Sequence, residues 1–212
     1  MSFTFFFKKK PQQLFEGFID IHNHLLPGVD DGSKSVEQSL EMLDLYADLG
    51  VKKIISTPHI YKDLYPNTKN TIENAFALLE KALHDQSVEL HGFAAEYLVD
   101  EFFMAEVKAQ TPLLTCFDRH ILIEIPFFDQ LKRLNEALFS LQNQGYAPIL
   151  AHPERYAALQ SIEEVEALKL KGAKMQLNAL SLLGFYGPEA QKKKELFFWE
   201  ELCEKQMELI SL

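Results

Sequence analysis

The chain alternates short apolar segments with longer amphipathic ones, and this order constrains its fold more than any other feature. The apolar segments have the length and composition of buried strands, and the segments between them place apolar residues at helical spacing. The expected strands are residues 18–22, 53–57, 88–96, 120–125, 147–151 and 174–177, and the expected helices are residues 35–49, 70–84, 101–108, 129–144 and 161–171. Strands that alternate with helices build βα units, so we predict an α/β fold with a parallel sheet.

The expected helix ends have recognisable signals. Ser35 with Gln38 and Ser161 with Glu164 have the spacing of a capping box, and Gly50 follows the first helix where a left-handed C-cap usually lies. The helix at residues 70–84 is expected to begin with Asn70 and Glu73 in its first turn.

Length and composition indicate one globular core and exclude several classes of function. The chain has 212 residues, of which 47% are hydrophobic and 25% charged. Its net charge of −10 repels nucleic-acid backbones, although bound cations can still attract a phosphate group. The two cysteines form no disulfide framework and fit a cytoplasmic location. Neither Cys116 nor Cys203 opens a C-x5-R phosphate loop, which disfavours a cysteine-dependent phosphatase.

Residues 1–17 are interpreted as a leader that precedes a domain at residues 18–212. The apolar run at residues 3–7 is too short for a membrane span or a signal sequence, and three lysines follow it. A disordered leader is the favoured interpretation, and weak contact with a membrane surface is the alternative.

Metal-ligand residue types fall at the C-terminal ends of five consecutive expected strands, where barrel proteins place their chemistry. His22 and His24 follow the first strand, and the side-chain period of two puts them on the same side. The next loop adds Asp30 and Asp31. The following four strand ends carry His59, Glu96, Glu124 and His152. Mixed imidazole and carboxylate ligands favour manganese, iron or zinc.

Arg155 lies close in sequence to the last of these histidines and offers a fork-shaped cation suited to phosphate. Each residue alone has a simpler interpretation: a lone H-x-H is a weak signal, a lone glutamate is usually a salt-bridge partner, and His152 alone fits a core histidine. The coincidence at five strand ends favours a metal centre that holds a phosphoryl oxygen. The remaining histidines, at positions 84, 91 and 120, lie elsewhere and are interpreted as structural.

The motifs in their order resemble a known family. DIHNHLLPGVDDG is followed by STPH, AAEY, LIEIPF and AHPERY. Over about residues 18–178 this series resembles the PHP family in its tyrosine-phosphatase branch, and DDG with HPERY separates that branch from histidinol-phosphate phosphatases. The resemblance implies a distorted (β/α)7 TIM-like barrel around a trinuclear divalent metal cluster, usually of manganese, with iron or zinc also compatible.

The resemblance also implies the role of each matched residue. The family's metal ligands are matched by His22, His24, Asp31, His59, Glu96, Glu124 and His152. Arg155 matches its substrate-phosphate arginine, and Asp31 and His59 are expected to act with it in catalysis. The implied reaction is hydrolysis of phosphotyrosine in the tails of bacterial tyrosine kinases that control polysaccharide export.

The chain departs from the family pattern at its C-terminal end. The family's last strand ends in a motif resembling S-D-x-H, but this chain has no Asp or His after Asn178. From about Leu196 onward we expect no strand, so the last strand is predicted to be missing and the metal site incomplete. Truncation or a frameshift is favoured over completion of the site by another subunit or by water. The resulting hypothesis is fewer metals and lower activity or stability than in the family.

Two other functions remain open. One is a PHP phosphatase for a small ester such as histidinol phosphate, and the other is a non-catalytic protein that binds phosphotyrosine. A serine hydrolase is disfavoured because no G-x-S-x-G elbow is present, and a dinucleotide enzyme because no glycine fingerprint follows the first strand. The loop at residues 61–67 follows His59 directly and is expected to border the pocket.

Overall fold

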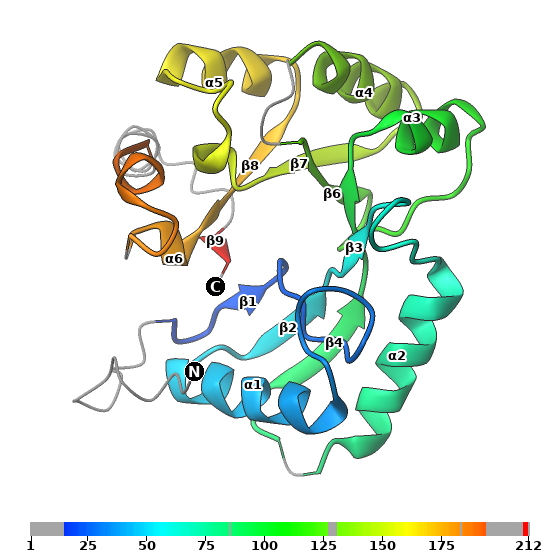
Figure 1. Cartoon of the computed structure of the whole chain (residues 1–212), viewed down its shortest axis with the longest axis vertical. Coiled ribbons are helices and arrows are strands. Elements are labelled where there is room, and N and C mark those ends of the chain that lie inside the picture. Colours follow the sequence, from blue (N-terminus) through cyan, green and yellow to red (C-terminus); the bar gives the residue numbers. More distant parts are fainter. Residues whose placement is uncertain (1–14, 85, 127–130, 183, 194–209, 212) are drawn as a thin grey trace.

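The protein is built from parallel strands flanked by helices (Figure 1). The structure, a computed structural model, describes residues 15–84, 86–126, 131–182, 184–193 and 210–211. The strands are β1 (Ile19–Asp20), β2 (Lys53–Ser56), β3 (His59–Ile60), β4 (Glu89–Phe93), β5 (Glu96–Leu98), β6 (His120–Glu124), β7 (Ala147–Ala151), β8 (Lys174–Asn178) and β9 (Ile210–Ser211). The helices are α1 (Val36–Leu49), α2 (Lys69–Ala82), α3 (Glu101–Lys108), α4 (Leu131–Asn143), the 3-10 turn η2 (Pro153–Arg155), α5 (Ile162–Leu170) and α6 (Ala179–Leu182).

Every pairing among the described strands is parallel, and the strands follow one another nearly in chain order. One sheet has the order β1-β2-β4 and the other has the order β3-β5-β6-β7-β8-β9. Backbone bonds cross the gaps between them, from Ala94 N to Ser56 O at 2.8 Å and from Glu96 N to Pro58 O at 3.0 Å. β2 with β3, and β4 with β5, are therefore two interrupted strands, which gives seven parallel strands in the described residues.

The structure corrects three expected elements. The strand expected at residues 88–96 is split at Ala94 and Ala95 into β4 and β5. Helix α2 begins at Lys69, one residue before the expected start at Asn70, because Thr68 and Thr71 form its capping box. The expectation of no strand beyond Leu196 is wrong at Ile210–Ser211, which pairs with Leu177 and Asn178 of β8.

Other helix signals are confirmed. The side chain of Ser35 caps α1 by accepting a hydrogen bond from Gln38 N, and Gly50 ends that helix with a left-handed φ of 91°. The expected capping box is only half formed, because the Gln38 side chain accepts from Lys34 N. Ser161 and Glu164 form both bonds of the capping box that starts α5. These local signals fix where the helices leave and rejoin the sheet.

Alternation along the strands separates two sets of buried residues. Ile121, Ile123 and Leu150 belong to the large core shared with the helices, whereas Leu122 and Ile149 belong to a smaller cluster. The smaller cluster is completed by Ile21, Ile55, Ala94, Cys116 and Ala151. Since successive side chains point to opposite faces, Glu124 lies on the same face as Leu122, so the smaller cluster lies at the base of the candidate site.

Residues just before position 18 contact the core. Phe15 packs against the core, and its backbone N–H donates to Leu49 O at 3.0 Å. The rest of the predicted leader, residues 1–14, lies outside the described residues. Among the described residues, no helix is long and apolar enough to cross a membrane.

Candidate metal centre

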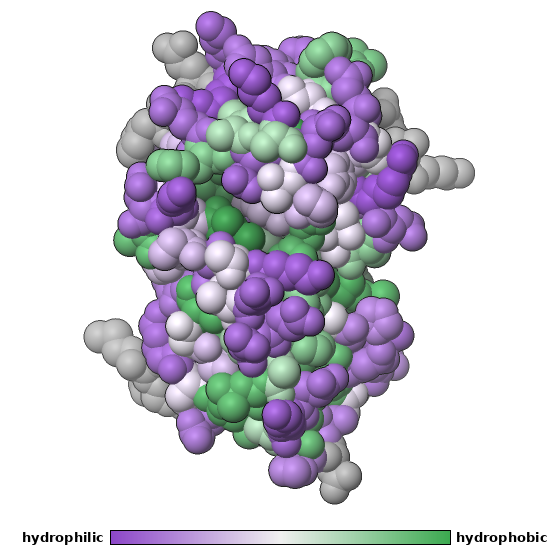
Figure 2. All heavy atoms as spheres, turned by 90° about the vertical axis from the view of Figure 1, so that its right-hand side faces the viewer, coloured by the Kyte–Doolittle hydropathy of each residue, from purple (hydrophilic) through white to green (hydrophobic). Residues whose placement is uncertain are grey.

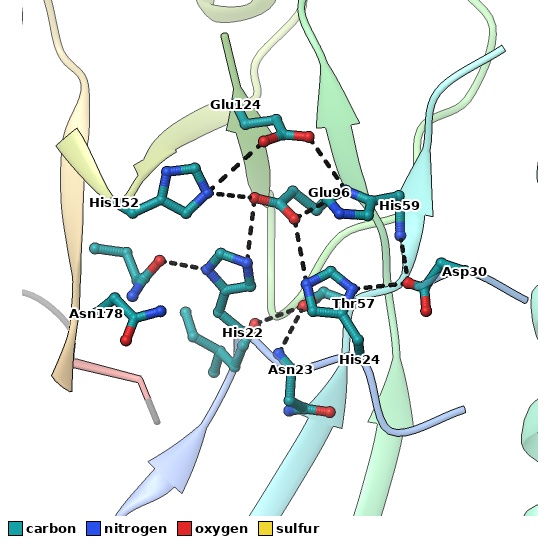
Figure 3. Close-up of polar contacts among 12 residues, drawn as sticks. His22, Asn23, His24, Asp30, Thr57, His59, Glu96, Glu124, His152 and Asn178 are labelled. Carbon is teal, nitrogen blue, oxygen red and sulfur yellow. Dashed lines mark hydrogen bonds and ion pairs between the residues drawn. The ribbon is translucent and has the colours of Figure 1, made fainter. Parts of the chain in front are cut away.

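Six of the seven expected ligands meet at the carboxyl ends of the strands (Figure 3). They are brought together from the loop after β1, the starts of β3 and β5, the end of β6 and the residue after β7, and they are His22, His24, His59, Glu96, Glu124 and His152. Because the strands are parallel and adjacent, residues far apart in sequence share this one edge.

Glu96 lies at the centre of the group. Its side chain is fully buried, and its Oε1 lies 3.1 Å from Nε2 of His22 and 3.1 Å from Nε2 of His152. Its Oε2 lies 3.1 Å from Nδ1 of His59 and 3.5 Å from Nε2 of His24. One carboxylate therefore faces four imidazoles, an arrangement that apolar packing alone does not require.

The second carboxylate, Glu124, spans two of the same histidines. Its Oε1 lies 3.1 Å from Nδ1 of His59, and its Oε2 lies 3.7 Å from Nε2 of His152. The seventh expected ligand, Asp31, is set apart at the rim: its side chain is 62% exposed, and Oδ1 lies 3.6 Å from Nε2 of His59. Asp31 can therefore reach a cation only on the solvent side of His59.

The donor set fits divalent cations. Three overlapping groups have ligand atoms within 4.8 Å of one another: His22 with His24 and Glu96, His24 with Asp31 and His59, and His59 with Glu96 and Glu124. Nδ1 of His59 and Oε2 of Glu96 are buried, and neither makes a hydrogen bond of normal geometry although they lie 3.1 Å apart. Such convergent donors would be satisfied by a cation, and imidazole with carboxylate suits a first-row divalent metal.

The orienting roles of two residues were not predicted from the sequence, although Asp30 was noted there as a nearby carboxylate. Gln176 Oε1 is hydrogen-bonded to Nδ1 of His22, and Asp30 Oδ2 lies 2.7 Å from Nδ1 of His24. Each bond turns the opposite ring nitrogen, Nε2, toward Glu96, which is how outer residues usually orient metal-ligating histidines. The family resemblance assigned a ligand role to Asp31 only, and nothing in the sequence indicated that Asp30 or a glutamine on a strand would orient a histidine.

Asp30 organises the loop before α1 as well as the imidazole. Its carboxylate also accepts hydrogen bonds from the backbone N–H groups of Gly32 and His59, each at 3.0 Å. Burial by itself raises the pKa of Asp30, but the hydrogen bond and charge of His24 and these two N–H groups together hold it below its usual value. The carboxylate is thus ionised and fixed.

Substitution of Asp30 by asparagine is expected to weaken metal binding by about 10- to 100-fold, because the amide cannot accept all three bonds. The check is the dissociation constant for Mn²⁺, measured by titration of the metal-free chain. Asp44→Asn on the exposed face of α1 is the matched control and is expected to bind as the wild type does. Equal affinity in Asp30→Asn would contradict the orienting role.

In the metal-free protein two of the histidines hold their protons strongly. Burial, the largest influence, lowers the pKa of His22, but the charge and hydrogen bonds of Glu96, with Gln176 and Asp20, raise it to about 9. Burial likewise lowers the pKa of His59, but Glu124, Glu96 and Asp30 raise it to about 9. Protons therefore occupy the positions that metals would take.

The metal-free chain is expected to lose stability as pH rises. A histidine whose pKa is raised from 6.5 to about 9 stabilises the fold fully below pH 6.5 and loses that contribution as the pH rises through about 9. For His22 the contribution lost is about 3 kcal/mol of unfolding free energy. Urea unfolding in chelator across this range measures it, and His22→Gln should reduce the slope. The stabilisation that added Mn²⁺ provides should instead increase as pH rises, because metal and protons compete for the same ligand atoms. Flat stability in chelator would contradict the assignment.

The HPERY segment connects the centre to the last strands. His152 has a left-handed backbone (φ 34°), and the buried Oε1 of Glu154 accepts from Asn178 N at 3.1 Å and Ser181 Oγ at 2.7 Å. Arg155 follows within the same turn, and its guanidinium lies 4.3 Å from the ring centroid of Tyr186. Arg155 and Tyr186 line a pocket of about 280 Å³, to which Lys193 also contributes. Tyr186 was not singled out from the sequence.

The remaining histidines lie outside the cluster. His91 is half-exposed and hydrogen-bonds to Glu89, and the ring of His120 packs 4.3 Å from that of Phe117. His84 lies just after α2 and belongs to none of the candidate metal groups in the described residues.

The parallel strands and the histidine–carboxylate cluster at their carboxyl ends define a barrel-like α/β protein with a site for divalent metal. The chain belongs to the CpsB/CapC family: the family model described as "Capsular polysaccharide synthesis, CpsB/CapC" matches residues 18–207. The PHP-type tyrosine-phosphatase resemblance is confirmed by this match and by the named relatives that follow.

Curated relatives carry tyrosine-phosphatase names. The chain is 35% identical to tyrosine-protein phosphatase YwqE of Bacillus subtilis over 174 residues, which is 81% of the chain and 68% of that protein. It is 33% identical to tyrosine-protein phosphatase CpsB of Streptococcus pneumoniae, over 86% of the chain and 77% of that protein. With putative tyrosine-protein phosphatase CapC of Staphylococcus aureus the identity is 32%, over 82% of the chain and 69% of that protein.

A solved structure confirms the predicted fold. The chain superposes with a TM-score of 0.77 and 30% identity on a structure from work on YwqE of Bacillus subtilis and CpsB of Streptococcus pneumoniae, which are described as unique metal-dependent tyrosine phosphatases. The superposition covers 92% of this chain and 78% of that one.

Proposed function

We propose that this chain is a metal-dependent protein-tyrosine phosphatase. The observation that carries the proposal is the buried Glu96 surrounded by four imidazoles at the carboxyl ends of the strands. The tyrosine-phosphatase names of the relatives support the reaction class. The proposed substrate is phosphotyrosine in the tail of a bacterial tyrosine kinase that controls capsule or exopolysaccharide synthesis, and the proposed metal is manganese.

The metals would be held by His22, His24, Asp31, His59, Glu96, Glu124 and His152. When bound, clustered divalent cations supply hydroxide near neutral pH and neutralise charge on a phosphoryl group. Glu96 and Glu124 offset the cationic charge from inside, while Asp31 does so from the solvent side. The negative net charge of the chain thus does not prevent binding of a phosphate ester.

Arg155 would orient the phosphate. Its planar guanidinium can donate to two phosphate oxygens at once, and stacking on Tyr186 limits the directions in which it can point. The leaving group is a phenol, whose pKa of about 10 is far below that of an alkyl alcohol, so its departure needs less help from a general acid. This difference favours an aryl ester at a site whose described residues offer mainly bases and cations.

A comparison of substrates tests the proposal. With Mn²⁺ present, kcat/KM for a phosphotyrosyl peptide should exceed that for histidinol phosphate, since both esters meet the same centre but only one has an aryl leaving group. A higher value for histidinol phosphate would favour the small-ester phosphatase. Binding of the peptide by a folded, metal-loaded chain without turnover would favour the non-catalytic alternative.

We further propose that the protein acts in the cytoplasm. Support comes from Cys116, which is a free, buried thiol rather than half of a disulfide. The proposed partner, a tyrosine kinase tail, would meet the centre at the carboxyl ends of the strands.

A further inference from the structure

The loop after β3 closes one side of the candidate centre. His59 begins β3, and residues 61–65 turn back at once: Tyr61 N donates to Tyr65 O at 3.0 Å, and Tyr65 N donates to Tyr61 O at 2.6 Å. Leu64 N adds a third bond to Tyr61 O, at 3.1 Å. The turn is therefore closed by its own backbone and needs no ligand to hold its shape.

Contacts on two further sides fix this loop relative to the centre. Asn67 Nδ2 donates to the carbonyl oxygens of Val29 and His59, both at 2.8 Å, and so joins the loop to the segment that carries Asp30 and Asp31. On the opposite side, Lys62 Nζ lies 4.4 Å above the ring of Phe102 at the start of α3. The loop thus borders the centre, as its position after His59 suggested.

Tyr65 is the side chain by which the loop reaches the cluster. Its ring is stacked on the imidazole of His59, with centroids 5.4 Å apart and an interplanar angle of 10°. Nearby apolar side chains remain exposed, with Leu64 at 60% and Phe102 at 43%. Figure 2 looks onto the side of the molecule that carries α2 and α3, where apolar residues reach the surface among hydrophilic ones. The loop therefore gives a charged centre an aromatic and apolar border.

We propose that Tyr65 is the specificity-determining residue that makes this centre prefer aryl over alkyl phosphate esters. This inference rests on the proposed phosphatase function and adds the residue that selects the substrate. When the phosphorus of an ester lies at the histidine cluster, the organic group of that ester must extend past the rim of the site. At this rim the ring of Tyr65 is stacked on the imidazole of His59. An aryl group beside that ring gains an aromatic contact that an alkyl chain cannot make.

The test compares two peptides of one sequence that carry phosphotyrosine or phosphoserine. In Tyr65→Leu, kcat/KM for the phosphotyrosyl peptide should fall about three- to tenfold, with the phosphoseryl value unchanged. Tyr65→Phe keeps the ring and should retain the wild-type ratio. Phe139→Leu replaces a 71% exposed aromatic residue on α4 and is the matched control, with no expected change. If kcat/KM fell equally for both peptides in Tyr65→Leu, Tyr65 would only hold His59 in place, and the proposal would be overturned. An unchanged kcat/KM for both peptides would overturn it as well.

A binding measurement separates this inference from the proposed function. Calorimetric titration of the Mn²⁺-loaded chain with phenylphosphonate and ethylphosphonate needs no turnover. The wild type should bind the phenyl compound more tightly, and Tyr65→Leu should lose that preference while Tyr65→Phe keeps it. If neither peptide is hydrolysed but this pattern holds, the function fails and the inference stands. Equal binding of the two phosphonates by the wild type, or binding of neither, overturns the inference.

Discussion

Replacement of Glu96 by glutamine is expected to lower metal-dependent phosphatase activity by at least about 100-fold and to release metal from the purified chain. Residues that only orient metal ligands cost about 10- to 100-fold when changed, and Glu96 faces four imidazoles directly. Glutamine keeps the size of the side chain but removes its negative charge, so bound cations lose their most buried counter-charge.

The measurement pairs steady-state kinetics with elemental analysis of the same preparation. Glu89→Gln is a suitable control, because Glu89 is a half-exposed glutamate that pairs with Lys53 and His91 far from the cluster. It should keep both metal and activity. A Glu96→Gln chain that retained both within about tenfold would show that the cluster is a hydrogen-bonded histidine core rather than a metal site.

Alanine at position 32 is expected to destabilise the fold by about 3 kcal/mol or more, and to disturb the centre at the same time. A Cβ on Gly32 would overlap the carbonyl oxygen and the Cβ of His24, and backbone atoms cannot move aside as a flexible side chain can. Because Gly32 N also donates to Asp30, the clash would shift both a candidate ligand and the residue that orients it.

The chain provides a matched control in Gly92 of β4, where a Cβ would meet no atom within 4 Å. Gly92→Ala should change the free energy of unfolding by no more than about 0.5 kcal/mol. Urea unfolding of both variants measures the difference. If Gly32→Ala were as stable as Gly92→Ala, the close approach of the loop to His24 would be wrong.

The sequence predicted the cluster well because its members share one rule. Histidines and glutamates at the ends of parallel strands meet at one edge, whatever their separation along the chain. The supporting residues did not follow from any such rule. Gln176 and Asp30 matter because of where the second nitrogen of a neighbouring ring points, which only the folded arrangement determines.

Some elements of the fold could likewise be predicted from the sequence and others could not. Helices with caps and apolar stripes were predicted nearly to the residue, as at α3 and α5. The short strands were not, because β3 and β9 have two residues each, too few for a periodic pattern. The break between β4 and β5 was missed because Phe93, Ala94 and Ala95 are consecutive apolar residues, with no glycine or proline to mark a turn between the two strands.

The proposed metal-dependent activity can be measured as hydrolysis of a phosphotyrosyl peptide by the purified 212-residue chain, with added Mn²⁺ and with chelator. We expect turnover that requires the metal and disappears in His152→Ala, because Nε2 of His152 lies 3.1 Å from Oε1 of Glu96 in the wild type. Turnover that persisted in chelator or in His152→Ala would contradict this expectation, and so would a folded, metal-loaded chain that does not hydrolyse the peptide.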